Sequence, residues 1–348
     1  MKRYLLLLSA FPICSQASAR EWITPDFYLD HSTAVAPLYS AQKSKSHPPE
    51  CRAKIAEVMC LVDPVPGQID PSLPRPCLQG GQAYAHLFEE LYDHYPPALQ
   101  KMFCSLNRIN IEKEFFGTAY AGLTKDPKGN VNGAALGIRK SVLDENLDLA
   151  TWASWKEQLS YGGVTDSYRV TPGLPLIRTN SKPGVSDFLY FVVAHEFGHL
   201  FDFSNDLNKT VPCLNPGDEC DMAPESWGAL SWRTDQHPLT ENEFADRTGL
   251  CFYWCKGSSI ELPRIAALYD ELFNATRFIS IYATTQPWDD FADSLAYFLA
   301  ARELGMLYEV DTAQGKTFDI IAKLSSPHFA TKYEYIDRFL KRNDIRYP

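Results

Sequence analysis

Two histidines and a glutamate have the spacing of a metal-binding helix in the segment His195-Glu196-Phe197-Gly198-His199. On an α-helix, residues four apart lie on the same face, so both imidazoles can reach one ion. Zinc binds histidine nitrogen at about 2.0–2.1 Å in a tetrahedral shell. Glu196 follows the first histidine, where it can accept a proton from water that the metal activates. The pattern predicts a single catalytic zinc ion held by His195 and His199, with Glu196 as general base.

The sequence around this motif is apolar over the length of a helix. The run from Asp187 to Phe201 is almost uninterrupted hydrophobic sequence outside the motif, and Ser186 is a residue type that commonly caps a helix N-terminus. A core helix without metal is the alternative. Burying two imidazoles and a carboxylate without partners costs free energy, which favours the metal site.

A third protein ligand is needed, because catalytic zinc sites use three and leave one position open. The best candidate is Asp289, which lies two residues after Pro287 at the expected start of a second helix. Asp293 lies four residues further on and therefore on the same face. It can accept a hydrogen bond from the free N–H of a ligand histidine and so orient the ring. The alternative is that these acidic residues merely complement the helix dipole.

Glu243 is a second candidate for the third ligand. It lies 44 residues after His199, within Thr240–Asp246. Gly249 and Cys251 soon interrupt any helical pattern there. The choice between Asp289 and Glu243 stays open on sequence grounds.

The two segments resemble the zincin metallopeptidases, in the glutamate-type branch that includes thermolysin-like and lethal-factor-like enzymes. The similarity extends from Tyr282 to Ser294, which matches a segment type of exported bacterial zinc peptidases. It implies a zincin-like fold, and it implies that Tyr282 stabilises the transition state. It also implies an edge strand that aligns the substrate, for which Ala134–Arg139 and Leu176–Thr179 are candidates. The usual ligand glutamate is replaced by Asp289.

The expected function is that of a zinc metalloendopeptidase, which hydrolyses peptide bonds in a peptide or protein substrate. The metal would polarise the scissile carbonyl, Glu196 would transfer the proton and Tyr282 would donate to the oxyanion. One alternative is a non-catalytic zincin-like module that uses the fold for binding. Another is a toxin or effector protease with the same chemistry and a single target.

The N-terminus has the features of a signal peptide. Lys2 and Arg3 precede a short apolar stretch, Tyr4–Ile13, and Ala17-Ser18-Ala19 is a cleavage pattern. Residues 1–19 are therefore expected to be removed after Ala19, so that the protein is secreted or periplasmic. No later segment reaches 18 uninterrupted apolar residues, which argues against membrane insertion.

Charge and cysteine content limit the partners and the compartment. The formal net charge of −10 becomes −12 without Lys2 and Arg3, which argues against nucleic acid as a partner. Eight of the nine cysteines follow the signal segment, and in an exported chain this even number predicts up to four disulfides. Cys213–Cys220 and Cys251–Cys255 are candidate local pairs.

Three regions are expected along the chain: the signal peptide 1–19, a proline-rich arm 20–76 with few regular elements, and a catalytic domain 77–348. The arm is either a propeptide or a disulfide-pinned segment packed on the domain. An α+β fold is predicted, with a small β-sheet and the active-site helix followed by a mainly helical C-terminal half.

Sequence patterns predict the positions of the individual elements. Helices are expected at Gln82–His94, Pro97–Leu106, Leu147–Leu159, Leu262–Phe273, Trp288–Glu303, Phe318–Leu324 and Thr331–Lys341. Short strands are expected at Ile109–Lys113, Thr118–Leu123, Ala134–Arg139, Tyr168–Thr171 and Leu176–Thr179. Residues 205–240 are expected to form a long loop tied by cysteines.

Overall fold

The structure is a computed structural model that describes residues 49–64, 75–163, 167–213, 219–252 and 260–348. The predicted signal peptide and residues 20–48 of the proline-rich arm lie outside these ranges. The described chain is mixed, with helices and two small sheets, as the α+β prediction requires.

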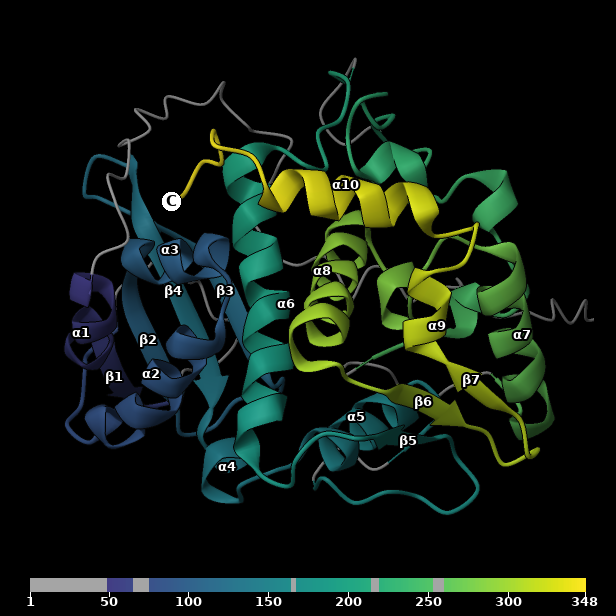
Figure 1. Cartoon of the computed structure of the whole chain (residues 1–348), viewed down its shortest axis with the longest axis horizontal. Helices are drawn as coiled ribbons and strands as arrows, with labels where there is room; N and C mark the ends of the chain where they lie inside the picture. The colour runs from purple at the N-terminus through teal and green to yellow at the C-terminus, as the bar shows by residue number, and fades with distance from the viewer. Residues whose placement is uncertain (1–48, 65–74, 164–166, 214–218, 253–259) are drawn as a thin grey trace, which may run out of the picture.

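A four-stranded sheet forms the N-terminal side of the molecule (Figure 1). Its strands are β1 (Met59–Val62), β2 (Leu106–Glu112), β3 (Ala119–Lys125) and β4 (Val131–Arg139). They lie in the order β1-β2-β4-β3, and only the β3–β4 pair is antiparallel. The helices beside this sheet are α1 (Pro49–Val58), α2 (Ala85–His94) and α3 (Pro97–Ser105).

Two long helices lie side by side in the centre of the molecule (Figure 1). They are α6 (Val185–Asn205), which carries the HExxH motif, and α8 (Pro287–Leu304). Strand β3 packs against α6, and α2 and α3 contact the same helix. The sheet therefore supports one side of α6 while α8 covers another.

The C-terminal half contains a second, antiparallel sheet in the order β5-β6-β7, formed by Leu176–Thr179, Tyr308–Asp311 and Thr317–Asp319. The remaining α-helices are α4 (Lys140–Asp144), α5 (Leu149–Leu159), α7 (Ile265–Ala275), α9 (Ile320–Leu324) and α10 (Ala330–Leu340). Short 3-10 turns occur at Gly81–Tyr84, Gly228–Leu230, Thr240–Asn242, Arg247–Gly249, Leu262–Arg264 and Tyr282–Thr284. Helix α5 packs on β5 and also contacts α6.

The start of α6 differs from the sequence prediction. The helix begins at Val185, and Gly184 occupies the capping position with φ of 116°. The Val185 amide donates to Asn146 Oδ1 at 3.1 Å, so a side chain from a distant segment satisfies the first helical N–H. The prediction of Ser186 as the N-cap is therefore wrong.

Helices α6 and α8 approach each other closely at Gly198. A Cβ built on Gly198 would lie 2.6 Å from the Cα of Ala292 and 3.0 Å from its Cβ. No side chain larger than hydrogen fits there, because a backbone atom cannot rotate out of the way. The glycine within the HExxH motif thus sets the distance between the two helices that carry the candidate ligands.

Several predicted elements need correction. Residues 168–171 form no strand, and the predicted helix Phe318–Leu324 is a strand at Thr317–Asp319 followed by helix α9. The expectation of few regular elements in the proline-rich arm is wrong for residues 49–62, which form α1 and β1. Because β1 pairs with β2, a cleaved propeptide ending at residue 76 would have to give up a strand of the sheet.

The cysteines of the described chain form disulfides. Cys51–Cys104 and Cys60–Cys77 join the α1–β1 segment to the rest of the domain, and Cys213–Cys220 confirms one predicted local pair. Cys251 is also disulfide-bonded, while Cys255 lies outside the described residues. These disulfides fit folding in an oxidising compartment.

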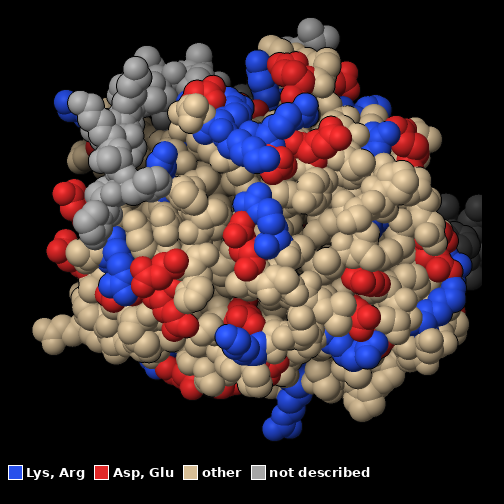
Figure 2. All heavy atoms as spheres, viewed as in Figure 1, with Lys and Arg blue, Asp and Glu red and all other residues tan. Residues whose placement is uncertain are grey.

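Helices of the described residues lack the combination of length and apolar composition that crossing a membrane requires. On the face drawn in Figure 2, Lys and Arg side chains are intermixed with Asp and Glu outside the grey atoms. Exposed pairs such as Lys341–Asp337 and Arg342–Asp344 bring opposite charges together. Charge on this face is therefore distributed rather than gathered into one basic surface.

Candidate metal centre

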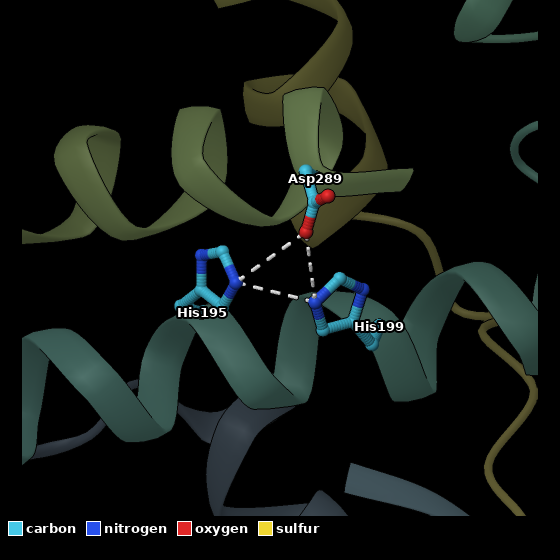
Figure 3. Close-up of side chains that lie close together, drawn as sticks. All are labelled: His195, His199 and Asp289. Carbon is cyan, nitrogen blue, oxygen red and sulfur yellow. Dashed lines mark hydrogen bonds and ion pairs between the residues drawn. The ribbon is translucent and has the colours of Figure 1, made fainter. Parts of the chain in front are cut away.

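His195, His199 and Asp289 come together between α6 and α8 (Figure 3). The Nε2 atoms of the two histidines lie 3.2 Å apart. Asp289 Oδ1 lies 4.0 Å from His195 Nε2 and 3.6 Å from His199 Nε2. All three residues are buried, and their ligand atoms lie within 4.8 Å of one another. The structure therefore assembles two nitrogen ligands and one oxygen ligand around one point.

Asp289 Oδ1 is the atom that tests whether a cation fits. It is fully buried and has no hydrogen-bond partner, whereas Oδ2 of the same carboxylate accepts from Thr285 Oγ1 at 2.9 Å. A buried carboxylate oxygen without a partner costs free energy unless a cation satisfies it. Two histidines and a carboxylate are a known donor set for catalytic zinc, which leaves a fourth position open. The residues present therefore fit a divalent metal ion.

Asp293 orients the first ligand histidine. His195 Nδ1 lies 2.8 Å from Asp293 Oδ1, and the N–H at this nitrogen donates to the carboxylate. The hydrogen bond leaves the lone pair on Nε2, the nitrogen that faces His199 and Asp289. Ser280 Oγ donates to the other oxygen of Asp293 and holds the carboxylate in place.

Burial controls the charges of the ligands. Desolvation lowers the pKa of His195, although its bond to Asp293 acts in the opposite direction, and it lowers the pKa of His199 further. Both imidazoles are therefore neutral at pH 7, as metal ligands must be. Desolvation raises the pKa of Asp289 to about 7, against the hydrogen bond from Thr285. Desolvation would raise the pKa of Asp293 too, but Lys156 and His195 lower it to about 2.

Glu196 is buried next to these groups on α6. Desolvation raises its pKa to about 8, and the charge of Asp289 contributes to the shift. A carboxyl with a pKa near neutral pH can both take and return a proton, which suits a general base and acid. A divalent cation at the three ligands would favour the ionised form.

Tyr282 lies beside the histidines in a short 3-10 turn that precedes α8. Its ring centroid is 5.7 Å from that of His195, and the edge contact with Phe252 has a centroid distance of 4.8 Å. The turn is held by buried Arg247, whose Nη1 donates to the carbonyl of Thr284 at 3.3 Å. The structure therefore places the predicted oxyanion donor next to the ligand set.

Glu243 has a different partner. Its carboxylate accepts from Arg247 Nε at 2.6 Å and from Arg247 Nη2 at 3.1 Å, and its side chain is 44% exposed. The structure groups Asp289 with the histidines and does not bring Glu243 to them. Glu243 instead orients the arginine that supports the turn at Tyr282.

The two candidate substrate-aligning strands differ in their availability. Ala134–Arg139 belongs to β4, which pairs with β2 on one side and β3 on the other. A strand with both edges paired cannot accept another, so this candidate is wrong. Leu176–Thr179 forms β5, which is terminal in the second sheet, while β3 is terminal in the sheet that supports α6.

A buried ion pair fixes α8 next to the candidate ligand Asp289. Lys332 Nζ on α10 lies 2.6 Å from both carboxylate oxygens of Asp290, and both side chains are inaccessible to solvent. Trp232 Nε1 donates to the same carboxylate at 3.2 Å. The pair connects α10 to the first turn of α8.

Lys332→Met is expected to lower the free energy of unfolding by about 3–5 kcal/mol, because it leaves the Asp290 charge buried and unpaired. Denaturant unfolding measures this. Lys341→Met is the matched control, since Lys341 is 70% exposed in its pair with Asp337 and should change stability by less than about 1 kcal/mol. Equal effects of the two variants would contradict the assignment of a buried charge pair.

Gly198→Ala is expected to weaken zinc binding by at least about tenfold, because the added methyl pushes α6 away from α8 and separates the ligands. Overpacking costs typically 1–3 kcal/mol, whereas replacing glycine by alanine in a helix returns only about 1 kcal/mol. A chelator competition assay measures the zinc affinity, and thermal unfolding measures the stability. Adding Ala292→Gly should not restore binding, because the nearest clash is with Cα; full restoration would contradict this account.

Comparisons with known proteins give no relative. No known protein family matches this chain, and neither a curated protein nor a solved structure matches it. The interpretation of the site therefore depends on the motif, the ligand geometry and the electrostatics of its residues.

Three residues of the site have no part in the sequence predictions: Lys156, Ser280 and Thr285. The two hydroxyl residues hold the carboxylates of Asp293 and Asp289. Lys156 lies four residues after Trp152 on an otherwise apolar helix face, and this isolated charge was the signal available in the sequence. Thr285 lies four residues before its partner Asp289, whereas the spacing of Lys156 and Ser280 does not indicate which carboxylate each one meets.

Proposed function

We propose that this protein is an exported zinc-dependent peptidase with a zincin-like fold. The observation that carries the proposal is the convergence of His195, His199 and Asp289, in which Asp289 Oδ1 is buried without a hydrogen-bond partner. An HExxH helix packed between a small sheet and a second helix that supplies the third ligand agrees with the zincin resemblance.

Each residue of the site has a role in peptide hydrolysis. Zinc held by His195, His199 and Asp289 would supply a Lewis acid that polarises a carbonyl and makes water more acidic. Glu196 accepts the proton of the attacking water and delivers it to the leaving amine. Tyr282 donates a hydrogen bond to the oxygen that becomes negative in the transition state.

The substrate backbone is proposed to lie along β3. This strand ends the sheet that packs on α6, so one of its edges has no neighbour in the described strand order. An extended peptide can add to such an edge through main-chain hydrogen bonds. This arrangement would bring a peptide bond to the helix that carries Glu196.

The compartment is proposed to be the periplasm or the exterior of the cell. The disulfides Cys51–Cys104, Cys60–Cys77 and Cys213–Cys220 support an oxidising environment. The signal-like pattern of residues 1–19 provides the route.

The test is cleavage of a diverse peptide library by the zinc-loaded protein, read by mass spectrometry, with Glu196→Gln treated identically. We expect products with the wild type alone, and their ends reveal the subsite preferences. Library products formed equally by both proteins would contradict the assignment of Glu196. Zinc-dependent binding of peptides without any products would point to a non-catalytic binding module instead.

A further inference from the structure

Lys156 extends from α5 into the metal centre. Its side chain is 12% exposed, and its Nζ lies 3.7 Å from the ring centroid of Tyr282. The same atom is 3.9 Å from Asp293 Oδ1 and 5.4 Å from the ring centroid of Trp152. The ammonium group therefore stands between the candidate oxyanion donor and the carboxylate that orients His195.

Both contacts are of kinds that hold side chains in place. A cation within about 6 Å of an aromatic centroid is attracted to the ring face, and the attraction strengthens when the pair is shielded from water. An ion pair with a side chain that is 2% exposed is also screened less than a surface pair. Lys156 thus restrains Tyr282 and Asp293 from one point on α5.

We infer that Lys156 is a positioning residue of this metal centre, which holds the Tyr282 ring beside His195 and limits the negative charge around the ligands. The expected effect of Lys156 on turnover rests on the proposed peptidase function. Its expected effect on zinc affinity rests only on the binding of a metal ion.

Removal of the Lys156 ammonium group should lower turnover and raise the affinity for a divalent ion. Without the ammonium, Tyr282 loses the cation against its ring, so that its hydroxyl is less well placed and turnover falls. The site also becomes more negative, because the ammonium group no longer offsets the charges of Asp289 and Asp293, so a divalent ion is attracted more strongly. A residue with a merely structural role would lower turnover and metal affinity together.

The experiment compares Lys156→Met with Lys156→Arg, and uses Lys140→Met as the matched control. Methionine keeps an unbranched side chain of similar length and removes the charge. Lys140 lies on α4, 5.9 Å from the ring centroid of Tyr84, and pairs with Asp144 outside the ligand set. Zinc affinity is measured by competition with a chromophoric chelator, and kcat and KM are measured on a peptide from the library.

For Lys156→Met we expect kcat to fall by about 10- to 30-fold with little change in KM. Zinc is expected to bind at least about threefold more tightly. Lys156→Arg should retain wild-type zinc affinity, and Lys140→Met should change neither quantity. In the double variant with Tyr282→Phe, the loss in kcat should be smaller than the product of the two separate losses. Both changes act on the same hydrogen bond, the one that the Tyr282 hydroxyl donates to the oxyanion.

Weaker or unchanged zinc binding in Lys156→Met would overturn the inference, whether or not turnover is measurable. Unchanged kcat, or fully multiplicative losses with Tyr282→Phe, would overturn the positioning of Tyr282. Absence of turnover in the wild type is a separate outcome: it contradicts the proposed peptidase function, and the zinc affinities still decide the role of Lys156.

Discussion

Glu196→Gln is expected to lower kcat/KM for peptide cleavage by about 100- to 10,000-fold while zinc remains bound. This is the usual range for a positioned general acid–base group. Glutamine keeps the shape of the side chain but cannot take the proton of the attacking water. His195, His199 and Asp289 are unchanged, so the metal content should equal that of the wild type. Steady-state kinetics and metal analysis of the same preparations measure both quantities.

The pH dependence of the wild type provides a second measurement of Glu196. Burial raises the pKa of its carboxyl to about 8 in the metal-free site, and a bound divalent cation would favour the carboxylate. The base must be ionised, so kcat/KM should fall as the pH decreases through its pKa, which we place below 8 in the zinc-loaded protein. The residual activity of Glu196→Gln should lack this acidic limb. An identical limb in the variant would assign the titration to another group.

Asp289→Ala is expected to weaken zinc binding by at least about 100-fold. Loss of a group that only supports a ligand already costs 10- to 100-fold in affinity, and Asp289 is a ligand itself. Glu243→Ala is the matched control, because this carboxylate pairs with Arg247 and should leave the affinity unchanged. Competition with a chelator measures both variants. Unchanged zinc affinity in Asp289→Ala together with weakened affinity in Glu243→Ala would make Glu243 the third ligand.

Zinc affinity of the wild type should also decrease as the pH falls below about 7. Desolvation raises the pKa of the Asp289 carboxyl to about 7, so below this pH zinc must displace a proton to bind. Above it the carboxylate is already ionised and the affinity should level off. Isothermal titration in buffers of different ionisation enthalpy reports the protons released. An affinity that does not change between pH 5 and 7 would contradict the role of Asp289.

Helix packing explains how a side chain as short as that of Asp289 reaches the histidines. Gly198 lets α6 approach Ala292 on α8 without room for a methyl group. The close approach brings the Asp289 carboxylate to within 3.6 Å of His199. An aspartate is one methylene shorter than a glutamate, so its helix must lie closer to the histidines, and the contact at Gly198 allows this approach.

Much of the site could be predicted from the sequence because its spacing is local. His195 and His199 share a face of α6 for the same reason that Asp289 and Asp293 share a face of α8: both pairs are four residues apart. A helix needs only its own residues to set these directions. Tyr282 is assigned through the resemblance to zincin metallopeptidases, and it lies in the short turn that precedes α8.

The sheets were harder to predict, since pairing of strands joins segments that are far apart in the chain. Strand β1 pairs with β2 across more than forty residues, and β5 pairs with β6 across more than a hundred. Short strands of four residues carry little periodicity of their own. Strand β7 has only three residues and runs directly into α9, so the sequence pattern favours one helix over both.

The sequence by itself determined the residue types of the candidate site and their helical spacing: the HExxH motif and the carboxylates one helical turn apart. Tertiary structure alone decided that Asp289, and not Glu243, lies with the histidines, and that Lys156 contacts both Tyr282 and Asp293. The physical reason is the distance along the chain over which each interaction acts. Helical periodicity acts over four residues, whereas these contacts depend on how α5, α6 and α8 pack, and packing is set by the whole core.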